Sequence, residues 1–243
     1  VEAMRALAYV VAAMFDQAHR AGDEAARSAA HAGVDLLIPI LKGWCTETGI
    51  EVASTGIQVH GGMGFIEETG AAQHLRDARI TTIYEGTTGI QANDLIGRKV
   101  LRDGGRSMQA LLAQIDGVCA QLEAGDDAQL HAIGARLREG SKSLADSMRW
   151  ILATGGQDLN AVLAGAVPFL HLCGVVCGGW QMARAALAAQ RKLAADSGDA
   201  DFYRAKIATA RFFADQDLSR ARGLAEATMH AGASTMALGE DQF

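Results

Sequence analysis

The residues of this chain best suited to chemistry lie between positions 83 and 91, which read IYEGTTGIQ. One carboxylate, Glu85, stands there between an aromatic ring and a Gly-Thr-Thr-Gly turn that we expect to open a helix, with Thr87 or Thr88 as its N-cap. The free N–H groups of a helix N-terminus favour an anionic or phosphate-bearing ligand. A carboxylate beside such a ligand can act as a base. Tyr84 would supply an apolar wall that raises its pKa, and Gly86 would let a ligand approach the backbone.

A second glycine-punctuated stretch, residues 58–65, reads QVHGGMGF. Taken alone, it is a helix end followed by a glycine turn, and Glu85 taken alone is a surface carboxylate or a partner of the helix dipole. The functional interpretation of residues 58–65 is a loop where a planar or phosphorylated group lies against bare backbone. The two stretches together favour that interpretation over the structural one.

Three segments carry a family resemblance: residues 58–65, the LRDARI segment at 75–80, and residues 83–91. They resemble the C-terminal helical domain of flavin-dependent acyl-CoA dehydrogenases, over about residues 1–105. Residues 203–208, YRAKIA, and 212–215, FFAD, resemble the extra helical domain of the longer family members. Some of those members act on fatty acyl-CoA, and one branch acts on 3-methylmercaptopropionyl-CoA.

The resemblance implies a role for each residue of the 83–91 segment. Glu85 corresponds to the catalytic base, which removes the α-proton of an acyl thioester while the β-hydride passes to the flavin. Its backbone N–H would polarise the thioester carbonyl. Tyr84 and Gly86 would line the acyl or thioester end of the pocket, and Thr87 and Gly89 occupy positions where the family contacts FAD.

The resemblance also implies a second copy of the chain. Gln58, Gly61 and Gly62 match a loop that touches the adenine portion of an FAD bound mainly to a neighbouring subunit, so at least a homodimer is expected. Two positions depart from the family pattern. Gly89 replaces a polar residue common in medium-chain members, and His60 stands where an apolar residue is frequent.

The implied reaction is α,β-dehydrogenation of acyl-CoA to trans-2-enoyl-CoA, with electrons passed from reduced FAD to an electron-transfer flavoprotein. Two alternatives stay open. The helices could form a non-catalytic oligomerisation or binding module in which Glu85 only caps a helix. The enzyme could also be an acyl-CoA oxidase, in which oxygen reoxidises the flavin.

The elements that must position these residues are predicted to be helices throughout. The chain has 243 residues with only two prolines, few aromatic residues and abundant alanine, and residues that favour helices dominate. We therefore predict an all-α fold: a helical bundle over residues 1–108, then a second helical domain over residues 109–243. The predicted helices cover residues 1–21, 23–47 with a kink or break at Pro39, 52–60, 70–79, 87–104, 106–124, 127–153, 158–196 and 201–233, with a loop at 61–64.

Charge argues against nucleic acid as a partner. The formal net charge is -6, and no basic run exceeds the pair Arg98-Lys99, whereas binding to phosphates needs a concentrated positive face. The four cysteines are interpreted as reduced thiols of a cytoplasmic protein. Cys173 and Cys177, with His171 nearby, have a spacing that would suit metal ligands, but their apolar setting favours core packing, so no metal site is predicted.

Residues 161–180 carry no formal charge and are just long enough for a membrane span of about 20 residues. Pro168, His171 and the amphipathic neighbouring segments favour a helix at the centre of a bundle instead, so we expect no membrane span. The chain begins inside an amphipathic pattern without an initiator Met. We therefore expect a fragment that lacks the flavin-holding domains of the family and is inactive in isolation.

Overall fold

The computed structural model describes residues 1–242, and every regular element within that range is helical. This confirms the predicted all-α class. The elements are α1 (Glu2–Arg20), α2 (Glu24–Val59), α3 (Gly62–Phe65), η1 (Glu67–Thr69), α4 (Ala71–Arg79), η2 (Ile80–Thr82), α5 (Thr88–Asp94), η3 (Leu95–Leu101), α6 (Arg106–Glu123), α7 (Ala128–Thr154), α8 (Leu159–Ala164), α9 (Ala166–Ala194), α10 (Ala200–Gln216), η4 (Leu218–Arg220), α11 (Ala221–Thr235) and η5 (Glu240–Gln242).

Helix α2 is a single uninterrupted helix with Pro39 inside it, so the predicted break and the separate helix at 52–60 are wrong. The Asp23 carboxylate caps its start by accepting hydrogen bonds from two backbone N–H groups. An internal proline costs a helix about 3 kcal/mol or more. In α2 that cost is offset by tertiary packing, because Pro39 lies in a turn whose neighbours Leu37 and Ile40 are fully buried.

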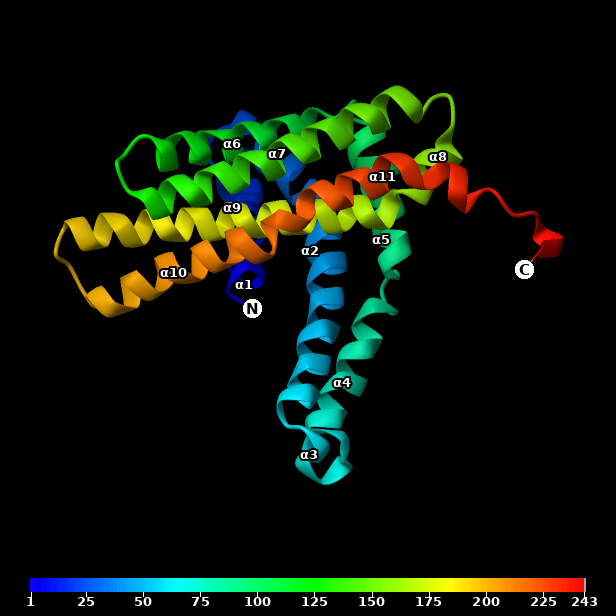
Figure 1. The fold of residues 1–243 in the computed structure, drawn as a ribbon. Coiled ribbons are helices and arrows are strands. Elements are labelled where there is room, and N and C mark those ends of the chain that lie inside the picture. The colour runs from blue at the N-terminus through cyan, green and yellow to red at the C-terminus, as the bar shows by residue number, and fades with distance from the viewer. Residues whose placement is uncertain (243) are drawn as a thin grey trace.

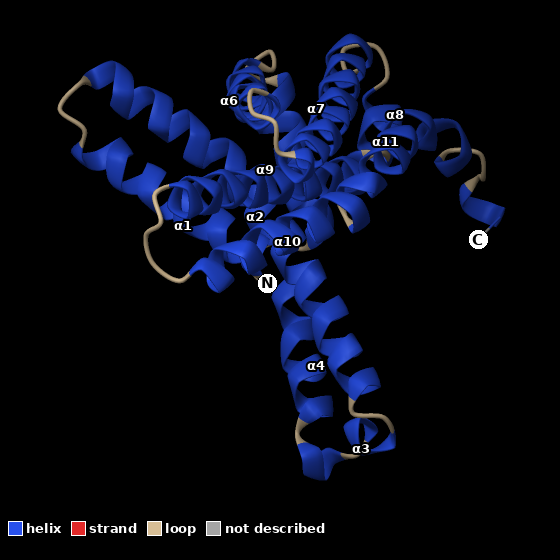
Figure 2. Cartoon of the chain, turned by 60° about the vertical axis from the view of Figure 1, so that its left-hand side comes forward, coloured by secondary structure: helices blue, strands red, loops and turns tan. Residues whose placement is uncertain are grey.

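The second half of α2 leaves the bundle and, together with α3 and α4, forms a projecting helical arm (Figures 1 and 2). The predicted loop at 61–64 is largely a short helix, α3, entered through Gly61, which has a positive φ of 61°. A Cβ on Gly64 would lie 2.3 Å from the carbonyl oxygen of Ile57. The chain therefore needs glycine at position 64 to turn back against α2 at the tip of the arm.

Two predicted long helices are divided. Residues 158–196 form α8 and α9, which meet at Gly165, where a Cβ would lie 2.1 Å from the carbonyl oxygen of Thr228 in α11. Residues 201–233 form α10, η4 and α11, with the first division at Asp217. The predicted helix at 87–104 is α5 continued by the π-helical η3. In each case the local pattern was helical, and at Gly165 the end point follows from a contact between distant segments.

Helix α9 lies at the centre of the bundle, beneath α7 and α11 in Figure 1. Of the described residues 1–242, it alone is long and apolar enough to cross a membrane by length and composition, and 83% of its most apolar window is buried inside the protein. That burial confirms the predicted central helix. One continuous hydrophobic core extends from Ala3 of α1 to Ala225 of α11, across position 108, and the two-domain division stays a prediction.

Candidate active site

Glu85 lies in the turn between η2 and α5, with its backbone in the left-handed region at φ 53°. Gly86 follows at φ 94°. Left-handed backbone is uncommon for a residue with a side chain, and it persists where the surroundings hold it in place. Two residues, Glu85 and Asp196, have this conformation among the non-glycine positions of residues 1–242. The candidate base is therefore held in a strained geometry.

Two side chains hold this turn by its backbone carbonyls. The Lys42 ammonium, from α2, donates to the carbonyl oxygen of Gly86 at 2.6 Å. The Gln91 side-chain amide, from α5, donates to the carbonyl oxygen of Glu85 at 3.2 Å. Successive peptide units are thus fixed from two different helices, which explains why the left-handed pair is stable.

The start of α5 is fixed in the same way. The Thr87 hydroxyl accepts a hydrogen bond from the N–H of Ile90 at 3.3 Å, so Thr87 is the N-cap that was predicted for position 87 or 88. The Thr88 hydroxyl is buried and donates to the carboxylate of Glu47 on α2. Gly89 is half-buried in the first turn of α5, next to the Thr87 hydroxyl.

The Glu85 side chain itself is exposed, and the Tyr84 side chain is 51% exposed. The expected apolar wall is therefore incomplete: within residues 1–242, Tyr84 does not remove Glu85 from water. A catalytic acid or base acts more effectively in a site from which water is excluded. At this turn, that exclusion would have to come from a ligand or a partner that binds over it.

The structure does not bring the two sequence motifs together within one chain. Gln58, Gly61 and Gly62 are exposed and lie at the tip of the arm, beside α3, whereas Glu85 lies at the other end of α4, next to α5 (Figure 1). Residues 58–62 and residue 85 of one chain therefore do not form a single compact site. The expectation that the glycine loop serves a neighbouring subunit stays a prediction.

Sequence reasoning missed several residues that shape the site. They are Lys42 and Glu47 on α2 and Gln91 at the end of the 83–91 segment, and none of their contacts was predicted from the sequence. Arg76, matched to a family motif, pairs with Glu67 of η1 through two hydrogen bonds of 2.8 and 2.9 Å. The pair lowers the pKa of the exposed Glu67 carboxyl, chiefly through the hydrogen bond from Arg76. It closes the turn between α3 and α4.

Large apolar side chains are exposed along the arm and around the turn. Val59 and Phe65 are each 80% exposed at the tip. Several large apolar side chains exposed in one region are typical of an interface or a ligand-binding groove. The exposed apolar side chains of this region are Val52, Val59, Met63, Phe65, Ile66, Ile80, Ile83, Tyr84 and Ile90.

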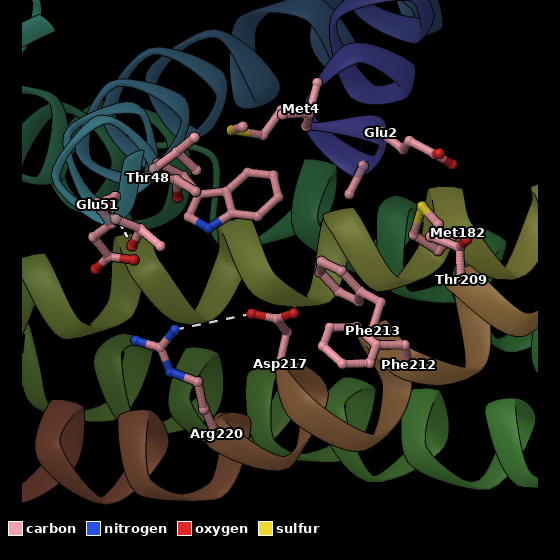
Figure 3. Close-up of a pocket in the computed structure, with 15 residues that line it drawn as sticks. Glu2, Met4, Thr48, Glu51, Met182, Thr209, Phe212, Phe213, Asp217 and Arg220 are labelled. Atoms are coloured by element: carbon pink, nitrogen blue, oxygen red, sulfur yellow. Dashed lines mark hydrogen bonds and ion pairs between the residues drawn. The ribbon is translucent and has the colours of Figure 1, made fainter. Parts of the chain in front are cut away.

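A separate pocket of about 500 Å³ lies between α1, α2, α9 and α10 (Figure 3). Its wall includes Trp44 and Phe213, and Asp217 and Arg220 lie 4.0 Å apart on the same side of it. Burial raises the pKa of Asp217. Neither sequence motif contributes a residue to this pocket. The turn at Glu85, with its held backbone and exposed carboxylate, is therefore the better candidate for an active site.

Two family models match the chain. Residues 1–101 match the model described as acyl-CoA dehydrogenase, C-terminal domain, and residues 111–239 match the one described as acetyl-CoA dehydrogenase C-terminal like. The chain belongs to the acyl-CoA dehydrogenase family. The resemblance inferred from the motifs is thereby confirmed, and it extends over both the bundle that carries Glu85 and the helices that follow.

Curated acyl-CoA dehydrogenases match across most of the chain. A 3-methylmercaptopropionyl-CoA dehydrogenase of Ruegeria pomeroyi is 52% identical over 89% of the chain and 36% of the relative. A broad-specificity linear acyl-CoA dehydrogenase of Mycobacterium tuberculosis is 33% identical over 74% of the chain and 30% of the relative. A butyryl-CoA dehydrogenase of Syntrophomonas wolfei is 30% identical over the whole chain and 40% of the relative. The chain thus spans well under half the length of these relatives.

Proposed function

We propose that this chain is the C-terminal helical part of an FAD-dependent acyl-CoA dehydrogenase that forms trans-2-enoyl-CoA, with Glu85 as the acceptor of the α-proton. The observation that supports this most directly is the left-handed backbone of Glu85, held by Lys42 and Gln91, with the carboxylate left exposed. A surface carboxylate that served only as a helix cap would not need this geometry. The actual cap of α5 is Thr87.

The residues expected to contact FAD fit such a group. A Cβ on Gly61 or Gly62 would meet no atom within 4 Å, so bare backbone is open to a flat ligand at the tip of the arm. Gln58 is exposed beside them, and Thr87 and Gly89 lie in the first turn of α5. Gln58, Gly61 and Gly62 would touch an FAD bound mainly to a neighbouring subunit, whereas Thr87 and Gly89 would contact the FAD that lies beside Glu85 and supplies the acceptor for the β-hydride of the substrate.

Glu85 would contribute to the reaction through two of its groups. Its carboxylate would take the α-proton of the thioester. Its backbone N–H makes no hydrogen bond within residues 1–242 and is free to donate to the thioester carbonyl, which would stabilise enolate-like charge. Lys42 and Gln91 bond only to backbone oxygens of the turn, which leaves both groups of Glu85 available.

The exposed apolar arm supports assembly into a homodimer or a larger oligomer, because a surface with Val59 and Phe65 this exposed is stabilised by a partner. The proposal includes an acyl-CoA substrate, an electron-transfer flavoprotein as electron acceptor and a cytoplasmic location. The relative with 52% identity makes 3-methylmercaptopropionyl-CoA the first substrate to test beside straight-chain acyl-CoA.

The test is a Glu85→Gln variant of the complete, FAD-loaded enzyme. We expect normal FAD content and no bleaching of the flavin when acyl-CoA is added, because the amide cannot accept the α-proton. Glu226→Gln, on the exposed face of α11, is the matched control and should bleach normally. Normal bleaching by Glu85→Gln would refute the assignment and favour the non-catalytic alternative. Comparing oxygen with the flavoprotein as oxidant of the reduced enzyme separates oxidase from dehydrogenase.

A further inference from the structure

We propose that Lys42 is a positioning residue for Glu85. In this role, its ammonium holds the turn so that the carboxylate and the backbone N–H of Glu85 both face the reacting thioester. This inference rests on the proposed function, because it assigns Lys42 a part in that reaction. Lys42 lies 44 residues before the carbonyl it binds, so no local sequence pattern reveals the contact.

Tight packing of α2 against α9 fixes the backbone position of Lys42. The next two residues of α2, Gly43 and Trp44, are buried against α9. A Cβ on Gly43 would lie 2.7 Å from a methyl carbon of Leu170, so the two helices touch closely at this point. Since α2 cannot shift easily there, the half-buried Lys42 reaches the turn from a rigid base.

The contact is of a strong type. An ammonium that donates to a carbonyl is a charge-assisted hydrogen bond, and the 2.6 Å between Nζ and the Gly86 oxygen is short for this class. Its acceptor belongs to the peptide unit immediately after Gly86. The neighbouring unit, after Glu85, accepts from Gln91. Rotation of either unit would break one of the two bonds.

Gly86 allows both bonds to form. A Cβ at this position would lie 2.9 Å from Nε2 of Gln91, the same atom that donates to the Glu85 carbonyl. Any side chain would therefore displace Gln91, besides being strained at φ 94°. Glycine at position 86 has a structural reason here, in addition to the contact with substrate that the family resemblance implies.

Holding this backbone determines where the base points. The direction of the Glu85 side chain and that of its N–H both follow from its backbone angles, and the left-handed conformation is unfavourable for a residue with a side chain when nothing holds it. If the Lys42 ammonium is lost, Glu85 can relax to a negative φ, which turns its carboxylate and its backbone N–H away from the thioester together. A misplacement of about 1 Å can lower a rate by about a hundredfold.

The test compares Lys42→Met and Lys42→Arg in the complete, FAD-loaded enzyme by rapid mixing with acyl-CoA. For Lys42→Met we expect the limiting rate of flavin bleaching to fall by about 10–100-fold, while the dissociation constant for acyl-CoA changes by less than about threefold. FAD content should stay normal. Lys42→Arg keeps a donor and a positive charge and should recover most of the rate.

Lys99→Met is the matched control. Lys99 also joins two elements, because its ammonium lies 2.7 Å from the Asp35 carboxylate of α2 and its side chain is 12% exposed. It does not touch the turn, so its loss should lower the unfolding temperature and leave the bleaching rate unchanged.

A wild-type bleaching rate in Lys42→Met would overturn the positioning role, as would a rate lost only together with FAD or with the folded structure. The result with Glu85→Gln keeps the two proposals apart. If that variant does not bleach while Lys42→Met bleaches normally, Lys42 is wrongly assigned and Glu85 remains the base. If Glu85→Gln bleaches normally, the proposed function itself fails.

Discussion

Replacing Gly174 by alanine tests the contact that joins α2 to the centre of the bundle. A Cβ on Gly174 of α9 would lie 2.1 Å from Cγ of Trp44, 2.5 Å from its Cβ and 2.6 Å from its Cδ1. The clash involves the root of the indole, which cannot rotate away. The far edge of the ring already lies close to Gly178, where a Cβ would be 2.6 Å from it, so the indole packs tightly against α9 at both ends.

The expected effect of Gly174→Ala is a clear loss of stability. Overpacking a buried site costs about 1–3 kcal/mol, and the upper end applies here because the helices themselves must separate. Alanine recovers about 1 kcal/mol of helix propensity. The net loss is about 2 kcal/mol, which corresponds to a fall of about 4–8 °C in unfolding temperature for a chain of this size.

The assay is thermal unfolding followed by circular dichroism, with Gly117→Ala as the control. Gly117 lies inside α6, and a Cβ there would meet nothing within 4 Å. The same substitution should therefore raise the unfolding temperature by about 2–4 °C, through helix propensity alone. If Gly174→Ala also raised it, the close approach of α2 and α9 at Trp44 would be refuted.

Two further predictions concern titration of buried groups. Burial raises the pKa of the Cys45 thiol to about 11 and that of the Cys177 thiol to about 12. At pH 8 the thiols of the native protein should therefore react with a thiol reagent at least about a hundredfold more slowly than those of the protein unfolded in urea. Equal rates would contradict this burial. Burial lowers the pKa of His171, against the pull of nearby carboxylates such as Glu47. His171 therefore binds a proton more readily in the unfolded chain than in the folded chain. The free energy of unfolding should consequently fall as the pH drops through about 6.5. His171→Gln should lessen that fall in urea titrations, and an unchanged pH profile would exclude this role.

Helix starts could be predicted where a side chain near in sequence decides them. Asp23, Asp127 and Asp199 each accept backbone N–H hydrogen bonds at the N-cap of α2, α7 and α10, close to the predicted starts. Helix ends set by distant contacts could not be predicted. Pro39 is tolerated because its neighbours are buried, and Gly165 ends α8 because the backbone of α11 passes against it.

The same distinction applies to the candidate site. Glu85 could be predicted because its motif is local, and the structure adds that its backbone is left-handed. The contacts that maintain that geometry come from Lys42 on a helix far back in sequence and from Gln91 on the next helix. A single sequence shows only that these side chains are able to donate, because their partners depend on how the helices pack.

A base must be correctly oriented and shielded from water, and the turn at Glu85 meets only the first of these two requirements. Each hydrogen bond to this turn within residues 1–242 ends on its backbone, and none reaches the Glu85 carboxylate. The chain therefore fixes the backbone from which the carboxylate projects, but it leaves the carboxylate exposed to solvent. Tyr84 and Ile83, which precede it, and Ile90 in α5 are all about half-exposed or more. Any surface that packs on these apolar side chains would also exclude water from Glu85. Under the proposed function, covering this turn and excluding water from Glu85 are the same event, so the base would become effective only in the assembled, substrate-bound enzyme.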